Sequence, residues 1–98
     1  MKKEYIPHPI DTSDVSLPAS LEDLAEQIAK NVHENWAKGR IDEGWVYGEE
    51  RSESLKTTPC LVAYEDLTDA EREYDRRTSM ETIKLIVRLG YDIRKKDE

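Results

Sequence analysis

The chain has 98 residues and little of what cross-linked, metal-stabilised or membrane-spanning proteins need. Its single cysteine, Cys60, cannot form a disulfide within the chain, and no second cysteine or close histidine pair indicates a zinc site. No run approaches the roughly 18 apolar residues of a transmembrane helix, and the N-terminal residues lack the apolar core of a signal peptide. We therefore expect a cytoplasmic protein that binds no metal and no other cofactor.

Basic residues are also in the minority, since 15 Lys and Arg stand against 22 Asp and Glu, which gives a formal net charge of −7. A surface of this sign repels the phosphate backbone of nucleic acids and anionic membranes, so we expect neither as a partner. A local arginine can still bind one small anion, because the field in a pocket can differ in sign from the net charge.

The apolar share of 37%, with two Trp and five Tyr, is sufficient for one small core. We expect a single domain over residues 1–98, with its core at about 5–93 and flexible charged tails at 1–4 and 94–98. Pro7 and Pro9 keep the segment around them extended, and such an arm usually lies across the domain that it precedes.

Periodicity and capping signals predict a mainly α fold with short strands. Apolar residues recur at helical spacing from Leu21 to Trp36, which predicts a first helix that begins near Pro18 and ends at Gly39. Two capping boxes predict two further helices, over about 69–77 and 79–89, and short apolar runs predict strands or tight turns at 44–48, 59–64 and 91–93. The expected architecture is α+β, with three helices and small antiparallel strand pairs.

One flank of the first helix carries side chains suited to a flat, anionic ligand, namely Ala29, His33, Trp36 and Arg40. The indole of Trp36 can stack on a ring, and the guanidinium of Arg40 can pair with a phosphate. The chain then reverses direction after Gly39, which brings Trp45 and Tyr47 within reach of this flank.

Arg76 and Arg77 lie at the predicted junction of the last two helices, close to a fresh helix N-terminus that favours anions. Structural roles compete with these binding roles. Trp36 suits the edge of a core, His33 suits a hydrogen-bonded interior position, and the two arginines suit ion pairs with the many carboxylates. From the residues alone, both interpretations stay open.

Catalytic patterns are weak throughout the sequence. No serine stands in a nucleophile-elbow setting, no glycine-rich phosphate loop is present, and the carboxylates are too numerous for one pair to stand out. We therefore expect no catalytic residues and no enzymatic activity.

Several strings, in order over about residues 5–93, resemble the RyR domain, the repeat module named for the ryanodine receptor calcium channels. They are Pro7-His8-Pro9-Ile10-Asp11-Thr12-Ser13, Val15-Ser16-Leu17-Pro18, Ala29 to Trp36, Arg40-Ile41, Gly44-Trp45-Val46-Tyr47-Gly48, Pro59-Cys60-Leu61-Val62, Tyr64, Leu67, Ser79-Met80-Glu81-Thr82 and Leu89-Gly90-Tyr91.

The resemblance implies a non-enzymatic, mainly helical module, found as paired repeats in the channels and as single copies in bacteria and phages, where nucleotide sensing has been proposed. It implies that a nucleotide sits between two repeats and stacks on the tryptophan of a His-Glu-x-Trp stretch, which His33 and Trp36 match here. Because this chain carries one repeat, such a sandwich requires a homodimer or another RyR-domain protein. We expect a stand-alone bacterial or phage protein.

Two functions from different classes are compatible with these observations. The first is recognition of a nucleotide or related purine by stacking on Trp36, with further contacts from Arg40, His33, Tyr47, Arg76 and Arg77. The second is a protein-interaction module without a small ligand, in which the aromatic residues at 44–48 form a hot spot. An open Trp36 indole beside a cation favours the first function, and a sealed indole favours the second.

Overall fold

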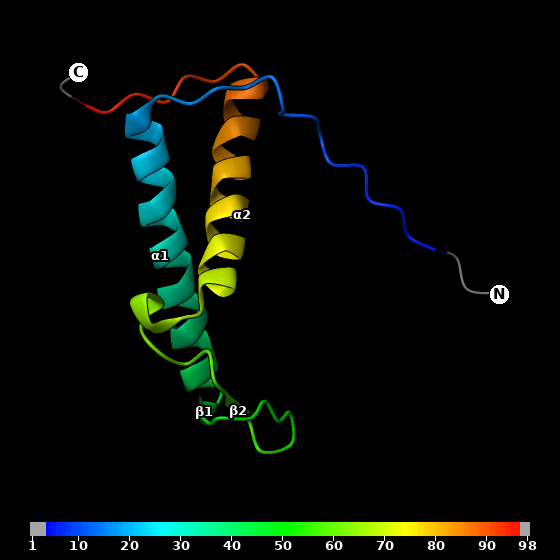
Figure 1. Cartoon of the computed structure of the whole chain (residues 1–98), viewed down its shortest axis with the longest axis vertical. Coiled ribbons are helices and arrows are strands. Elements are labelled where there is room, and N and C mark those ends of the chain that lie inside the picture. Colours follow the sequence, from blue (N-terminus) through cyan, green and yellow to red (C-terminus); the bar gives the residue numbers. More distant parts are fainter. Residues whose placement is uncertain (1–3, 97–98) are drawn as a thin grey trace.

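A computed structural model describes residues 4–96 and shows a hairpin of two long antiparallel helices with a loop region folded against one end (Figure 1). The elements in chain order are α1 (Ala19–Asp42), β1 (Val46–Tyr47), β2 (Thr57–Thr58), the 3-10 helix η1 (Tyr64–Asp66) and α2 (Asp69–Arg88). Of the tails predicted to be flexible, residues 1–3 and 97–98 lie outside the described residues.

The first helix is longer than the sequence pattern predicts, because α1 continues through Gly39 to Asp42. The backbone N–H of the C-cap residue Glu43 donates to the carbonyls of Gly39 and Arg40, each at 3.1 Å. Gly44 follows with φ of 95°, a conformation that favours glycine, and so it ends the helix. A glycine inside a helix costs only about 1 kcal/mol, and the long stretch of α1 that precedes Gly39 outweighs this cost.

The prediction of two helices after residue 68 is wrong, because α2 is one continuous helix of 20 residues. Thr68 forms the first capping box as predicted, since its hydroxyl accepts from the N–H of Glu71 at 3.2 Å. In the second sequence box, the Thr78 hydroxyl instead donates to the Tyr74 carbonyl at 3.0 Å. Inside a helix the backbone N–H groups already have partners, so Thr78 has no free donor to cap.

The predicted antiparallel strand pairs are also wrong. The described part of the chain has one two-stranded sheet, in which β1 and β2 are parallel, with Val46 opposite Thr57 and Tyr47 opposite Thr58. A Cβ on Gly48 would lie 2.7 Å from the Cβ of Thr57, so only glycine permits this approach. Residues 59–60 form a turn and residues 61–63 are irregular before η1 begins at Tyr64, so neither 59–64 nor 91–93 contains a strand. The fold is therefore mainly α, with two helices.

The helices approach closely because several of their buried residues are small. Ala25 and Ala29 on α1 and Ser79 on α2 are buried, and Ile83 is the largest side chain that is fully enclosed. Tyr64 and Leu67, from η1 and the residue that follows it, pack on Ala29 and complete the core at the loop end.

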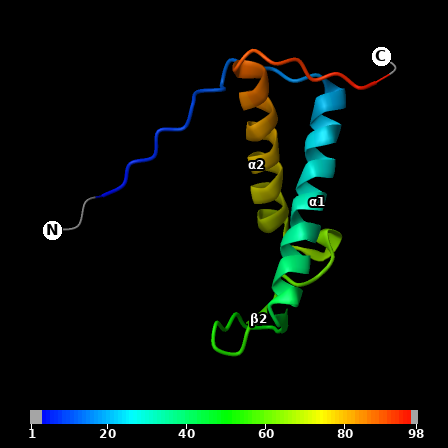
Figure 2. The same cartoon turned by 180° about the vertical axis from the view of Figure 1, so that it is seen from behind.

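The segment before α1 crosses the other end of the hairpin (Figure 2). The Thr12 hydroxyl donates to Glu81 Oε2 at 2.5 Å, and Arg88 Nη1 pairs with Asp14 Oδ2 at 2.8 Å. Residues 4–10 then leave the helices as an extended arm. Within residues 4–96, neither helix combines the length and the apolar character that crossing a bilayer requires.

Candidate functional site

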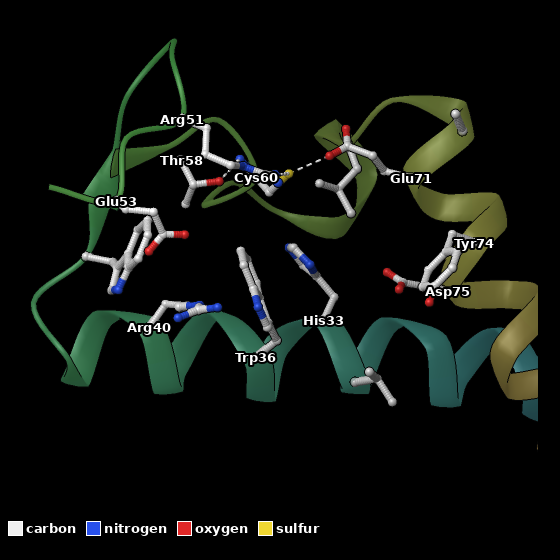
Figure 3. Close-up of a pocket in the computed structure, with 14 residues that line it drawn as sticks. His33, Trp36, Arg40, Arg51, Glu53, Thr58, Cys60, Glu71, Tyr74 and Asp75 are labelled. Atoms are coloured by element: carbon white, nitrogen blue, oxygen red, sulfur yellow. Dashed lines mark hydrogen bonds between the residues drawn. The ribbon is translucent and has the colours of Figure 1, made fainter. Parts of the chain in front are cut away.

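A cavity of about 590 Å³, here called the groove, lies between the C-terminal half of α1, the start of α2 and the loop region (Figure 3). It exists because α1 extends past the first turn of α2 (Figure 1), so irregular chain rather than a helix covers the end of α1. Its principal side chains are those of His33, Trp36, Arg40, Trp45, Arg51, Glu53, Cys60, Glu71, Tyr74 and Asp75.

An aromatic and cationic row runs along the α1 wall of the groove. The rings of His33 and Trp36 stack with centroids 5.6 Å apart and planes 26° apart. The Arg40 guanidinium carbon lies 5.9 Å from the Trp36 ring centroid and 4.9 Å from that of Trp45. These α1 residues are spaced by three and four positions, so they share one face, as the helical wheel predicts.

The indole of Trp36 is half-buried, neither fully open nor sealed. Figure 3 shows it upright on α1 between His33 and Arg40, with its ring reaching into the groove. The His33 side of the ring is covered by the stacked imidazole. On the other side lies the guanidinium of Arg40, a side chain that is 40% exposed and also pairs with Glu43 at 3.6 Å. This second face of the indole is the candidate surface for a flat ligand.

His33 has both of the roles that the sequence leaves open for it. Its ring is buried, and Nε2 lies 2.7 Å from the Val62 carbonyl oxygen, which can only accept, so Nε2 carries a hydrogen. This bond ties α1 to the loop region and fixes the ring orientation. The same ring lines the groove beside Trp36.

A cluster of three polar side chains, Arg51, Cys60 and Glu71, lines the α2 side of the groove. The Cys60 thiol donates to Glu71 Oε2, and Arg51 Nη2 lies 3.5 Å from the sulfur. Burial, followed by the Glu71 carboxylate, raises the pKa of the Cys60 thiol, so it stays protonated. The hydrogen bonds from Cys60 and Thr68 lower the pKa of Glu71, which therefore stays charged.

Asp75 also lines the groove, but its pKa is shifted in the opposite direction to that of Glu71. Burial raises the pKa of its carboxyl group, the Glu71 charge raises it further, and nearby His33 lowers it. Two arginines and three carboxylates, Glu53, Glu71 and Asp75, line the groove and leave it with one net negative formal charge. Figure 3 shows Arg40, Arg51 and Glu53 towards one end of the groove and Asp75 towards the other.

The predicted site residues divide into two sets. His33, Trp36, Arg40 and Trp45 meet in the groove. The remaining three do not line it: they are Tyr47, which is exposed on β1, Arg76, whose Nε donates to Glu26 Oε2 at 2.6 Å, and Arg77, which borders a second cavity beside the N-terminal arm. Because α2 is continuous, Arg76 and Arg77 lie in mid-helix and have no fresh N-terminus near them.

Sequence reasoning missed the walls contributed by the loop and by α2. The residues in question are Arg51, Glu53, Cys60, Glu71, Tyr74 and Asp75. Glu71 carried a detectable signal, but as the last residue of a capping box. The others stand in irregular chain or on a helix face that has no apolar pattern, so no local signal places them opposite Trp36.

Comparison with known families agrees with the resemblance drawn from the sequence. The family model of the RyR domain matches residues 5–95, nearly the whole chain. This chain belongs to the RyR domain family.

Proposed function

We propose that the groove binds a nucleotide or a related purine without catalysing a reaction. The observation that carries the proposal is the half-buried Trp36 indole, which has one face stacked on His33 and the other next to the partly exposed Arg40 guanidinium. A cavity of about 590 Å³ is within the range of about 300–1,000 Å³ typical of small-molecule sites.

The two ends of the groove suit the two parts of such a ligand. At one end, Arg40 and Arg51 offer guanidinium groups for a phosphate. At the other end, the Asp75 carboxyl offers a hydrogen-bond partner for ring nitrogens or an exocyclic amine. Arg40 lies closer to Trp45 than to Trp36, so a base can enter against the Trp36 face while Arg40 turns towards the phosphate.

The charge of the groove limits how many phosphates it favours. Its lining has one net negative formal charge, and the chain as a whole has −7. Each additional phosphate therefore increases the repulsion from Glu53 and Glu71. We expect adenosine and AMP to bind more tightly than ATP at low ionic strength, and this difference to decrease as salt screens the charges.

The test is calorimetric titration of the folded chain with adenosine, AMP, cyclic AMP and ATP. Loss of one base–aromatic contact costs about 1–3 kcal/mol, so Trp36→Ala should weaken binding by roughly 5- to 150-fold. Tyr47→Ala is the matched control, because Tyr47 is an exposed aromatic residue outside the groove, and its affinity should match that of the wild type. No binding by the wild type at millimolar ligand, with the fold intact, would contradict the proposal.

Asp75→Asn separates binding from folding. Burial raises the pKa of Asp75, so its charged carboxylate costs folding free energy. This cost is absent below the ordinary pKa of 3.8, grows as the pH rises from there, and is complete above the raised pKa. The asparagine variant should therefore unfold at an equal or higher temperature at pH 7, while its affinity for adenosine changes. An unchanged affinity would remove Asp75 from the ligand contacts.

A second candidate function is protein recognition. Three apolar side chains of the loop region, Val46, Tyr47 and Leu55, are exposed and lie beyond the groove. They suit a protein partner, either a second copy or another RyR-domain protein. Sedimentation of the wild type and of Tyr47→Ala separates the two functions: concentration-dependent association that Tyr47→Ala abolishes supports recognition, and a monomer at all concentrations rules out the homodimer.

A further inference from the structure

A single stripe on α2 connects the groove with a second cavity at the other end of the hairpin. The stripe consists of Ala70, Tyr74, Arg77, Glu81 and Leu85, spaced by three or four residues, so these side chains share one helix face. Ala70 and Tyr74 line the groove, while Arg77, Glu81 and Leu85 line the second cavity, of about 460 Å³. The outer rim of the groove and the second cavity are therefore continuous along α2.

The N-terminal arm covers only one end of this stripe. Pro9 and Ile10 form a wall of the second cavity, and the Thr12 hydroxyl holds the arm to Glu81. Before residue 9 the arm departs from α2 (Figures 1 and 2), which leaves Tyr5 86% and Ile6 66% exposed. The Cα radius of gyration is 16.9 Å, against about 13 Å for a compact chain of this length.

We propose that residues 5–10 form a strap that lies along the α2 stripe and places Tyr5 and Ile6 over Tyr74 at the open rim of the groove. The direction is suitable, because the arm runs from Thr12 at Glu81 towards its N-terminus, and α2 runs from Glu81 back towards Ala70 in the same sense. No reversal of the chain is needed.

The length is suitable as well. Seven residues of extended polyproline-like chain, from Thr12 to Tyr5, span about 22 Å. Eleven helical residues, from Glu81 to Ala70, rise about 16 Å along α2. The strap therefore reaches the rim of the groove with several ångströms to spare for crossing the helix surface.

Two features favour the position of the strap along the α2 stripe. Tyr5, Ile6 and Tyr74 each present a large apolar surface to water, and contact between them removes that surface from solvent. Pro7 and Pro9 already restrict the backbone, so seating the strap loses less conformational entropy than ordering a flexible arm would. The matched family region begins at residue 5, so the strap lies within the RyR domain.

Disulfide trapping tests the strap directly, in a Cys60→Ala background that removes the only other thiol in the sequence. Glu4→Cys/Ala70→Cys joins the strap to the stripe and leaves Tyr5, Ile6 and Tyr74 intact. Glu4→Cys/Asn31→Cys is the control, because Asn31 is exposed on the side of α1 opposite the groove. Under mild oxidation the first pair should close within the monomer at least about fivefold faster, since a seated strap raises the effective concentration of the two thiols.

Adding Tyr5→Ser and Ile6→Ser should reduce the first rate to that of the control pair. Equal rates for the two pairs, rates insensitive to the serine changes, or disulfide-linked dimers in place of closed monomers each overturn the strap. No nucleotide is present, so such a result leaves the proposed ligand untouched.

Small-angle scattering supplies a measurement without engineered thiols. The wild-type chain should have a smaller radius of gyration than Tyr5→Ser/Ile6→Ser, and equal values overturn the strap.

Discussion

The two ends of the α1–α2 hairpin are packed in different ways. Where α2 ends and α1 begins, helix residues fill the interior, with Ser79 and Ile83 enclosed and the N-terminal segment held outside by Thr12. At the other end, α1 extends past α2, and Tyr64 and Leu67 from the loop region pack against it.

The difference explains where the groove forms. Two helices with small facing residues interlock and leave no space, whereas a loop must also satisfy its own backbone groups and packs less completely. Polar side chains serve that purpose at the loop end, since His33 donates to the Val62 carbonyl and the Thr58 hydroxyl accepts from the Cys60 N–H at 3.2 Å. The helical end acts as the scaffold, and the loop end carries the candidate site.

The largest expected effect is at the helical end. Ile83→Ala should lower the free energy of unfolding by about 2–4 kcal/mol, because it leaves a cavity in a closely packed interior. Ile86→Ala, three residues further along α2 and 37% exposed, is the control and should cost less than about 1 kcal/mol. Urea denaturation of both variants measures the difference, and similar losses would contradict the enclosed packing of Ile83.

The next effect tests the continuity of α2 at the loop end. Thr68→Ala should cost about 1 kcal/mol, because it removes the hydroxyl that caps the Glu71 N–H. Thr78→Ala should leave stability unchanged or slightly higher, because Thr78 lies inside the helix, where alanine is the better helix former. Thermal unfolding of both variants is the measurement, and an equal loss at Thr78 would indicate a second helix start.

An effect of similar size, but of opposite sign at two glycines, tests where α1 ends. Gly39→Ala should stabilise the protein by up to about 1 kcal/mol, because its Cβ would have open space within the helix. Gly44→Ala should destabilise it by about 1 kcal/mol, because φ of 95° is strained for alanine. Circular dichroism melting curves give both signs, and a destabilising Gly39→Ala would place the helix end at Gly39.

The smallest effect concerns the ion pair that links the two helices midway. The hydrogen bond from Arg76 lowers the pKa of Glu26 below its ordinary value of 4.5. The pair therefore stabilises the fold fully above about pH 4.5, and this contribution is lost as the pH falls through the lowered pKa. Glu26→Gln should cost no more than about 0.5 kcal/mol at pH 7, because the pair is over 40% exposed on both sides.

Low pH is the control for this pair, because protonation of Glu26 removes the ion pair without a substitution. Unfolding free energies of the wild type and of Glu26→Gln should converge as the pH falls below the lowered pKa of Glu26. A difference that persists there would assign the effect to packing or to the Tyr64 hydroxyl, which donates to the other Glu26 oxygen at 3.3 Å.

Features that depend on neighbouring residues in the chain were predictable. The helical spacing of α1, the capping box at Thr68 and the flank that bears His33, Trp36 and Arg40 all follow from local geometry. The errors arose where a local signal was outweighed. Gly39 and Thr78 are both compatible with a helix end. The long stretch of α1 before Gly39, and the stretches of α2 on both sides of Thr78, are stabilised as helix by tertiary packing.

Motif order and helical periodicity are written in consecutive residues, so the family, the helical regions of the chain and the row of side chains on α1 could be inferred from the sequence. The tertiary structure was needed to show that α2 is one helix, that Cys60 and Asp75 face that row, and that Tyr47, Arg76 and Arg77 do not. The reason is physical: a short loop without periodicity takes its path from what it packs against, so the far walls of a groove are absent from any local pattern.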